Sequence, residues 1–280
     1  DKLKGGRRVD KSKESPEIRF AVLIDGDNAQ PSHVVDVLKE VAKYGKITIR
    51  RVYGDWTSSQ MQSWKKHLPQ NAVQPVQQFR NTVGKNATAS AMIIDAMDLL
   101  YGGNVEGFAI VSSDSDYTRL AIRLREDGKF VVGIGKMQTP EPFVRACDLF
   151  VYTENLVKPP AVPADTKAPA RKKGKAAGGK KTATGRQAAE ETPAPKKADP
   201  TAEARSLLSQ GFDMVVQDDG WATLSDLGKA LRRLDPAFDS RTYGYSQLSK
   251  MIEAHQDLYE IEREAEKGPS QIYFRKRESR

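Results

Sequence analysis

The stretch Phe20-Ala21-Val22-Leu23-Ile24-Asp25-Gly26-Asp27-Asn28 decides the fold that this sequence predicts. Its first half is an uninterrupted apolar run, which is typical of a strand buried on both faces of a parallel sheet. The run ends at Asp25, where the chain is expected to leave the strand. Ligands of parallel α/β sheets bind in the crevice at the carboxyl ends of the strands. We therefore expect a polar site at this point of the chain.

A second cluster of acids follows a second apolar run. Ser112-Ser113-Asp114-Ser115-Asp116 comes directly after Phe108-Ala109-Ile110-Val111. If both runs belong to one parallel sheet, Asp25, Asp114 and Asp116 meet at one edge. Carboxylates that close repel one another unless a cation lies between them. The two clusters together predict a site for a hard divalent cation, Mg²⁺ or Mn²⁺.

Helix capping is the structural alternative for these polar side chains. Asp and Asn accept hydrogen bonds from backbone N–H groups at helix starts, so Asp27 or Asn28 could serve there. We expect capping to account for one residue of each cluster, with Asp25 and Asp114 as the leading site candidates. Farther along, Asp95 is open to a site role or to plain solvation.

The segment from residue 18 to 157 alternates strand-like and helix-like patterns. This alternation predicts an α/β fold, a parallel sheet with helices on both faces. The expected strands are 18–24, 46–53, 72–76, 108–111, 129–134 and 148–152. The expected helices are 31–44, 58–67, 88–101 and 117–126. Pro75 lacks a backbone N–H, so its strand is expected at an edge of the sheet.

Composition divides the chain into four parts. Residues 1–16 are a basic tail and residues 158–200 a linker with 11 basic and 4 acidic residues; both are expected to be disordered. The charge excess of these segments, within a net charge of +8, suits contact with a polyphosphate or a solvated spacer equally well. Residues 201–277 predict three helices and a β-hairpin, the order of a winged helix-turn-helix.

Several classes of protein are excluded or disfavoured. Cys147 is the single cysteine, so neither an intrachain disulfide nor a cysteine-based zinc site is expected. No apolar stretch approaches the roughly 18 residues of a membrane span, so a cytoplasmic protein without membrane contact is expected. No histidine accompanies the serines after Val111, which disfavours a serine nucleophile. Trp56 and Trp64 suit core packing better than base stacking.

Motifs in the first half of the chain resemble the NYN domain, a branch of the PIN-like nucleases, and within it the LabA-like bacterial group. They are FAVLIDGDNA (20–29), RRVYGDW (50–56), GKNAT (84–88), IIDAMDLLY (93–101), VSSDSDYTRLA (111–121) and TPEPFVRACDLFVY (139–152). The C-terminal segment is similar to a LOTUS (OST-HTH) domain through GWATLSDLGKALRRL (220–234) and IYFRKR (272–277). This pairing implies a role in RNA metabolism.

The resemblance implies functional residues at matching positions. Asp25 and Asn28 match the family's first aspartate and its nearby asparagine, and Asp114 and Asp116 match the later aspartates. Asp25, Asp114 and Asp116 would then be the metal ligands, and Lys85, Asn28 and Ser113 would contact the nucleic acid. The family usually places an acid where this chain has Ala89, at the start of the helix after GKNAT. Losing one carboxylate weakens metal affinity.

Three hypotheses of function follow. The first is a Mg²⁺- or Mn²⁺-dependent endoribonuclease with a C-terminal RNA-binding module, impaired at Ala89. The second is an RNA-binding or adaptor protein whose nuclease site is silent. The third is a phosphatase of the haloacid dehalogenase type, because Asp25-Gly26-Asp27 has that enzyme's Asp-x-Asp pattern.

Overall fold

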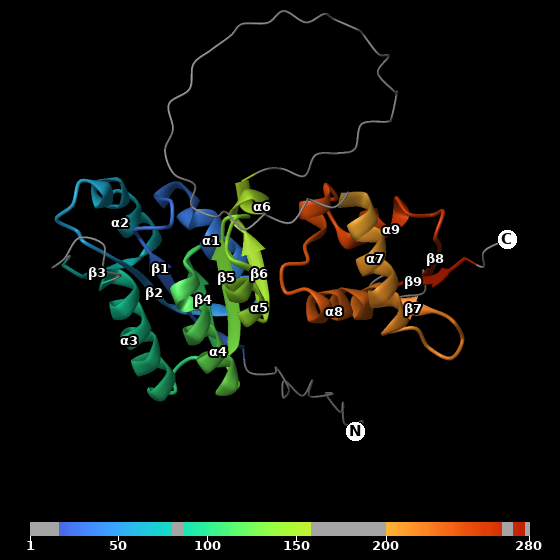
Figure 1. Cartoon of the computed structure of the whole chain (residues 1–280), viewed down its shortest axis with the longest axis horizontal. Helices are drawn as coiled ribbons and strands as arrows, with labels where there is room; N and C mark the ends of the chain where they lie inside the picture. Colours follow the sequence, from blue (N-terminus) through green and yellow to red (C-terminus); the bar gives the residue numbers. More distant parts are fainter. Residues whose placement is uncertain (1–16, 80–86, 158–199, 265–270, 278–280) are drawn as a thin grey trace, which may run out of the picture.

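The N-terminal region is built on a parallel sheet (Figure 1). The computed structural model describes residues 17–79, 87–157, 200–264 and 271–277. Within these residues the sheet has six strands in the order β3-β2-β1-β4-β5-β6, and all neighbouring pairs are parallel. The strands are β1 (Arg19–Asp25), β2 (Lys46–Gly54), β3 (Gln74–Gln77), β4 (Gly107–Val111), β5 (Phe130–Gly135) and β6 (Leu149–Tyr152). The predicted fold class is confirmed, with Pro75 on an edge strand.

The sheet changes its direction of growth between β1 and β4. These two strands pair side by side, with Ile24 opposite Val111 in their last register pair. Later strands are added outward from β1 on one side and from β4 on the other. A sheet opens a ligand crevice at the carboxyl ends of the strands at such a switch point. Asp25, which ends β1, and Ser112, which follows β4, therefore lie at this crevice.

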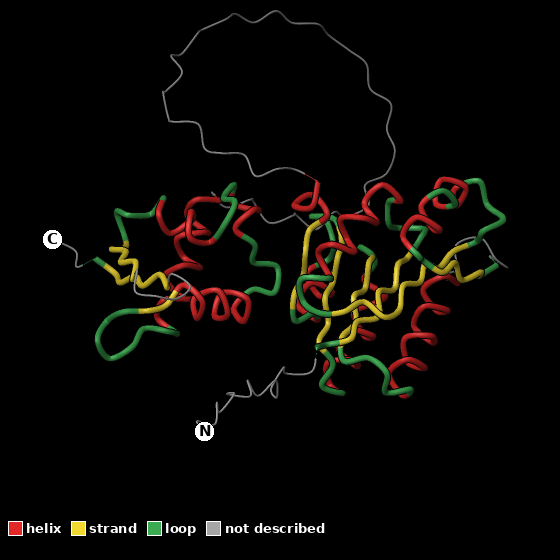
Figure 2. The backbone as a smooth tube through the Cα atoms, turned by 180° about the vertical axis from the view of Figure 1, so that it is seen from behind, coloured by secondary structure: helices red, strands yellow, loops and turns green. Residues whose placement is uncertain are grey.

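Helices cover both faces of the sheet (Figure 2), because alternate residues of a strand point to opposite faces. In β1, Ala21 and Leu23 belong to one core cluster, and Val22 and Ile24 to the other. The helices on the first face are α3 (Ala87–Tyr101), α4 (Thr118–Glu126) and α5 (Glu141–Ala146), with the 3-10 turn η3 (Ser115–Tyr117). Those on the second are η1 (Pro31–His33), α1 (Val34–Val41), η2 (Gln60–Trp64), α2 (His67–Asn71) and α6 (Thr153–Val157).

Short helices are where the structure differs from the sequence prediction. The segment 58–67, predicted as one helix, is the 3-10 turn η2 followed by α2. A 3-10 turn aligns residues three apart, and it places Met61 and Trp64 together in the core. The helices α5 and α6 were not predicted from the sequence, because segments of 6 and 5 residues are too short to show a helical period.

The C-terminal region has a separate hydrophobic core. Its elements are α7 (Pro200–Asp213), β7 (Ala222–Thr223), α8 (Leu224–Leu234), the 3-10 turn η4 (Ser240–Tyr243), α9 (Leu248–Glu253), β8 (Tyr259–Glu264) and β9 (Gln271–Lys276). The three strands form a small antiparallel sheet in the order β7-β9-β8. Leu208, Leu231 and Phe274 are buried between the helices and this sheet. Helices followed by a hairpin are the predicted order; β7 was not predicted.

The described helices also bear on membrane contact. None of them combines the length and the apolar composition that crossing a bilayer demands.

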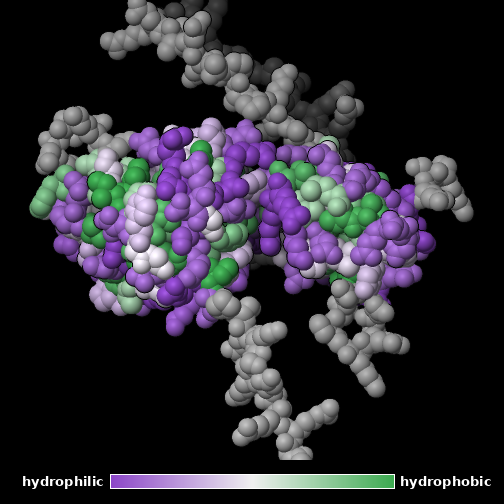
Figure 3. Space-filling view, turned by 90° about the horizontal axis from the view of Figure 1, so that it is seen from below, coloured by the Kyte–Doolittle hydropathy of each residue, from purple (hydrophilic) through white to green (hydrophobic). Residues whose placement is uncertain are grey.

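Seen from below, both regions present mainly hydrophilic residues at the surface (Figure 3). The predicted tail, the linker and the hairpin turn around Gly268 lie outside the described residues.

The C-terminal region contacts the outer edge of β6. The Phe150 N–H donates to the carbonyl oxygen of Pro236 at 2.7 Å. The Arg241 guanidinium lies 3.4 Å from the buried carboxylate of Glu40, which belongs to α1. An edge strand exposes backbone groups that can pair with another chain. The C-terminal region therefore protects this edge of the sheet.

Arg19 and Glu106 form an ion pair at the amino ends of β1 and β4, the end of these strands away from Asp25. This pair predicts a pH dependence of the stability. Glu106 accepts bonds from the backbone N–H of Arg19 at 2.8 Å and from its guanidinium. The bond to that side chain is the main reason why the pKa of Glu106 falls from 4.5 to about 2. A lowered carboxyl pKa contributes stability that is present above the unfolded value and is lost as pH falls through the folded one.

We expect Glu106→Gln to lower the free energy of unfolding most above pH 4.5 and progressively less as the pH falls toward about 2. Urea unfolding at a series of pH values measures this. Equal pH dependence in the two proteins would contradict the assignment. Glu126→Gln, at an exposed residue on α4, is the control and is expected to leave the pH dependence unchanged.

Candidate functional site

Asp25 is a buried carboxylate at the carboxyl end of the central strand, and only 2% of its surface is exposed. Its Oδ2 accepts three hydrogen bonds: from Asn28 Nδ2 at 2.8 Å, from Ser112 Oγ at 3.0 Å and from the Tyr117 hydroxyl at 3.1 Å. Its Oδ1 accepts the backbone N–H of Asp27 at 3.1 Å. These donors come from the ends of β1 and β4 and from η3, so the predicted meeting of the two clusters is observed.

Burial raises the pKa of Asp25, and its hydrogen bonds to Asn28, Ser112 and Tyr117 oppose that shift without cancelling it. Burial also raises the pKa of the Tyr117 hydroxyl, and the charges of Asp25, Asp114 and Asp27 raise it further. Three carboxylates therefore act electrostatically on one hydroxyl. A cation in this environment would favour the charged form of Asp25.

Gly26 is needed for the chain to turn away from the strand here. Its N–H donates to the Tyr53 carbonyl at 2.9 Å, which extends the pairing of β1 with β2 by one residue. A Cβ at this position would lie 2.7 Å from the same oxygen and 2.6 Å from the Met61 methyl group. The backbone can approach β2 so closely because this residue has no side chain. Gly26 thus helps to place Asp25 at the crevice.

Asp114 acts as a helix cap in the structure. Its Oδ1 accepts the backbone N–H of Asp116 at 3.0 Å, at the start of η3. Asp114 is half-buried and Asp116 is exposed. Across the described parts of the chain, no three side chains of His, Cys, Asp or Glu are grouped closely enough to hold a metal ion. Metal ligation by Asp25, Asp114 and Asp116 therefore stays a prediction.

The position of the expected family acid lies next to the site but holds a methyl group. Ala89 is in the first turn of α3 and is 6% exposed within the first core cluster. Its neighbour Thr88 donates through Oγ1 to Asp27 Oδ2 at 2.7 Å. This bond links the first turn of α3, which contains Ala89, to the residues after β1. Lys85, the predicted phosphate contact, lies outside the described residues.

Other candidate residues have structural roles. Asp95 forms an ion pair with Arg51 and accepts a hydrogen bond from the Tyr53 hydroxyl. Trp64 is buried, and its Nε1 donates to the Gly26 carbonyl at 3.3 Å. The packing role expected for Trp64 is thus observed, and Asp95 is held in an ion pair rather than merely solvated.

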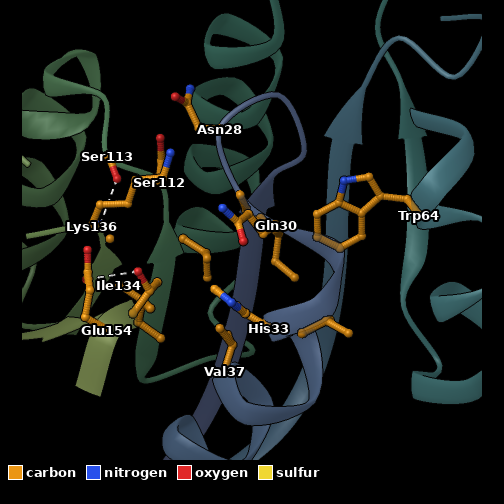
Figure 4. A pocket seen from close by; sticks show the side chains of 16 residues that line it. Asn28, Gln30, His33, Val37, Trp64, Ser112, Ser113, Ile134, Lys136 and Glu154 are labelled. Atoms are coloured by element: carbon orange, nitrogen blue, oxygen red, sulfur yellow. Dashed lines mark hydrogen bonds between the residues drawn. The ribbon is translucent and has the colours of Figure 1, made fainter. Parts of the chain in front are cut away.

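A cavity of about 280 Å³ opens beside Asp25, at the carboxyl ends of β1, β4 and β5 (Figure 4). Its lining residues are Ile24, Asn28, Ala29, Gln30, His33, Val34, Val37, Trp64, Val111, Ser112, Ser113, Ile134, Gly135, Lys136, Thr153 and Glu154. Asn28 and Ser113 were predicted to contact nucleic acid, His33 was expected on a helix surface without a catalytic role, and Lys136 and Glu154 were not singled out. Lys136 follows a strand directly, as Asp25 and the Ser112 cluster do, and that position was the available signal.

Models of two protein families match this chain. Residues 19–154 match the NYN domain, and residues 195–271 match the OST-HTH/LOTUS domain. The order is the one that the motifs implied. The first match contains the six-stranded sheet with Asp25 and the cavity, and the second contains the described C-terminal region up to the first residue of β9.

A relative and two solved structures show more limited similarity. The chain is 28% identical over 129 residues to Uncharacterized protein MJ0482 of Methanocaldococcus jannaschii, which is 44% of this chain and 50% of that protein. It therefore spans half the length of that curated relative.

The structure of VPA0982, a protein of unknown function from Vibrio parahaemolyticus, is 17% identical with a TM-score of 0.41 and covers 50% of this chain and 95% of its own. An NMR structure of an uncharacterized protein from locus NE0665 of Nitrosomonas europaea is 29% identical with a TM-score of 0.25. The match covers 36% of this chain and 94% of that protein's chain. Both scores are below 0.5, so neither structure defines the fold here.

The matched domains agree with the observed architecture. A PIN-like nuclease domain joined to a LOTUS domain supports a nuclease-like, RNA-binding protein. The buried carboxylate at the switch point is where an α/β sheet of this kind would hold its site. The chain thus carries an NYN domain at residues 19–154 followed by an OST-HTH/LOTUS domain at residues 195–271.

Proposed function

We propose that this protein binds RNA and hydrolyses its phosphodiester bonds with Mg²⁺ or Mn²⁺, at a rate kept low by Ala89. The observation that carries the proposal is the buried, hydrogen-bonded Asp25 at the switch point of an NYN sheet. The nuclease-like domain would comprise residues 17–157 and the RNA-binding domain residues 201–277, joined by the basic linker.

The donors around Asp25 fit a hard divalent cation in kind. The expected metal ligands are the carboxylate oxygen atoms of Asp25, Asp114 and Asp116, and oxygen is the ligand that Mg²⁺ and Mn²⁺ prefer. Among the described residues, three side chains donate hydrogen bonds to Oδ2 of Asp25, and the Asp27 N–H donates one to Oδ1. Oδ1 can therefore accept a further bond or bind a cation. Asp25 and Asp114 would hold the ion, with Asp116 as a direct or water-mediated ligand. Bound there, the ion would neutralise charge on the phosphate and lower the pKa of water.

The residues of the chain position the reacting groups. Asn28, Ser112 and Tyr117 fix the orientation of the Asp25 carboxylate through Oδ2. The attacking water would give up a proton to solvent as its oxygen bonds to phosphorus, and the bond from phosphorus to the leaving oxygen would break while that oxygen takes up a proton from solvent. A carboxylate at position 89 would accept a hydrogen bond from that water. The Ala89 methyl group cannot, so we expect slow turnover.

RNA binding would be shared between the two domains. The LOTUS domain match is the support for the C-terminal one. The linker has 11 basic and 4 acidic residues between positions 158 and 200, which favours contact with phosphates along a strand. A linker of this length raises the effective concentration of one domain at the RNA held by the other.

A silent nuclease site is the second candidate, and two observations favour it. Ala89 replaces the expected acid, and in the described segments no group of three metal-ligating side chains is present. In this case the protein would bind RNA without cleaving it. The haloacid dehalogenase hypothesis gains no support, because the matched family is NYN.

Asp25→Asn separates these candidates from one another. If the site is active, we expect the substitution to reduce Mn²⁺-dependent cleavage of a labelled RNA by at least about tenfold, because it removes a ligand charge. RNA affinity, measured by fluorescence anisotropy, is expected to change little. Asp98→Asn, on the outer face of α3, is the matched control. Equal cleavage by Asp25→Asn and the unchanged protein would exclude this site as the source of activity.

A further inference from the structure

The space inside the cavity beside Asp25 is not used in the hydrolysis proposed above, although Asn28 and Ser112 border it. It lies at the carboxyl ends of β1, β4 and β5, between these strands and the helices α1 and α6. Its volume of about 280 Å³ is just below the roughly 300–1,000 Å³ of pockets for drug-sized ligands. The cavity is therefore of a size to take one ring system rather than a stack of several.

The residues that line the cavity are of two kinds, aliphatic and polar. Ile24, Val34, Val37, Val111 and Ile134 form an aliphatic wall. The other lining side chains include amides, hydroxyls, an imidazole, a lysine and a glutamate. An apolar enclosure with a few polar groups is typical of a site for a flat heteroaromatic ligand, whose faces are apolar and whose edge is polar.

Two residues connect the cavity with the Asp25 carboxylate. Asn28 and Ser112 both line the cavity, and both donate hydrogen bonds to Asp25 Oδ2, at 2.8 and 3.0 Å. Ile24 faces the cavity, and the next residue along the strand, Asp25, points to the opposite face of the sheet. A phosphate held beside Asp25 and a ring held in the cavity would therefore lie on either side of one strand end. This is an arrangement that a nucleotide could span.

Lys136 and Glu154 provide a donor and an acceptor on one side of the cavity, across from Trp64 (Figure 4). The Glu154 carboxylate accepts the backbone N–H of Met137, the residue after Lys136, at 3.1 Å. The Thr153 hydroxyl donates to the same carboxylate at 3.2 Å. A lysine and a glutamate on the same side of a cavity suit a ring edge that has a carbonyl oxygen beside an N–H. Uracil and guanine have this edge, whereas cytosine and adenine present an amino group beside an unprotonated ring nitrogen.

We propose that this cavity binds a keto base, uracil or guanine, of the RNA whose phosphate lies beside Asp25. The inference rests on the proposed RNA-binding function and adds base selectivity to it. Lys136 donates to the carbonyl oxygen, and Glu154 accepts from the neighbouring ring N–H. A base that lacks this pattern cannot use the Lys136 donor and the remaining acceptor capacity of Glu154, and polar groups that a ligand fails to match are the usual source of strong discrimination.

The test is photo-crosslinking of the full chain to a uridine octamer that contains one 4-thiouridine. Peptide mapping is expected to place a crosslink on the segment that contains His33 or Trp64. Unlabelled uridine octamer is expected to compete about tenfold better than cytidine octamer for this crosslink. GMP and UMP as competitors then distinguish guanine from uracil as the preferred base, with AMP as the negative control.

Two variants supply the controls. Val37→Phe fills the cavity and is expected to abolish this crosslink while crosslinks within residues 201–277 persist. Glu154→Gln keeps the shape of the cavity and is expected to reduce the uridine preference to about twofold or less. Circular dichroism checks that each variant is folded, and if Val37→Phe unfolds, Glu154→Gln decides alone.

The outcomes separate this inference from the function on which it rests. Crosslinks confined to residues 201–277, or an unchanged preference in Glu154→Gln, would overturn the base site and leave RNA binding intact. No crosslink anywhere on the chain would overturn the RNA-binding function, and the base site with it.

Discussion

Ala89→Asp is expected to increase Mn²⁺-dependent RNA cleavage by about 100-fold, the usual range for one positioned acid–base group. Position 89 lies in the first turn of α3, and its neighbour Thr88 is hydrogen-bonded to Asp27. A carboxylate there would add the charge that the described site lacks. Cleavage of a labelled RNA under single-turnover conditions, with increasing Mn²⁺, measures both the rate and the apparent metal affinity.

Ala89→Asn is the matched control, because it has nearly the same size as aspartate and no charge. It is expected to give no increase, and Asp25→Asn is expected to abolish the gain when combined with Ala89→Asp. The new carboxylate would be buried at a position that is now 6% exposed, so it should destabilise the metal-free protein. Mn²⁺ should then raise the melting temperature of Ala89→Asp more than that of the unchanged protein. No cleavage by Ala89→Asp on any RNA would contradict hydrolysis and favour the silent site.

The central strands could be predicted from the sequence because they are buried on both faces. The run from Phe20 to Ile24 has no polar residue, and its alternate members fill two different core clusters. An uninterrupted apolar run can be recognised from the residues of the strand itself, without knowing which elements pack against it. The helix α5 and the turn η2 are short, so their residues are ordered by packing against the sheet and not by a local period.

The site was predictable to the extent that strand ends determine it. The two acidic clusters were expected at one edge if their apolar runs belong to one parallel sheet, and the structure pairs the two strands directly. The contacts at Oδ2 of Asp25 also need Tyr117, an aromatic residue that a sequence pattern assigns to the core. The cavity depends on residues from α1, β5 and α6, far apart in the chain, so tertiary packing alone brings them together.

Phe150→Ala is expected to lower the free energy of unfolding of the N-terminal region by about 3–5 kcal/mol, the usual cost of truncating a buried phenylalanine. Phe150 is 1% exposed in β6, and its ring lies 5.7 Å from that of Phe143 and 5.5 Å from that of Tyr152. A Cβ at Gly133 would lie 2.4 Å from the Phe150 ring, so the neighbouring strand is shaped around it. Alanine would leave a cavity that β5 cannot collapse to fill.

Because the two regions have separate cores, Phe150→Ala is expected to lower the free energy of unfolding mainly in the N-terminal region. Phe150 belongs to the core of the sheet, whereas Leu231 belongs to the core of the C-terminal region. Trp221 reports on the second region and Trp56 and Trp64 on the first, so single-tryptophan variants can follow the two transitions separately in urea. Phe150→Ala should move the first transition most, and Leu231→Ala the second. Because the Phe150 N–H also donates to Pro236, a smaller shift of the second transition in Phe150→Ala would measure the coupling across that contact. Equal shifts of both transitions would instead mean that the two cores unfold as one unit.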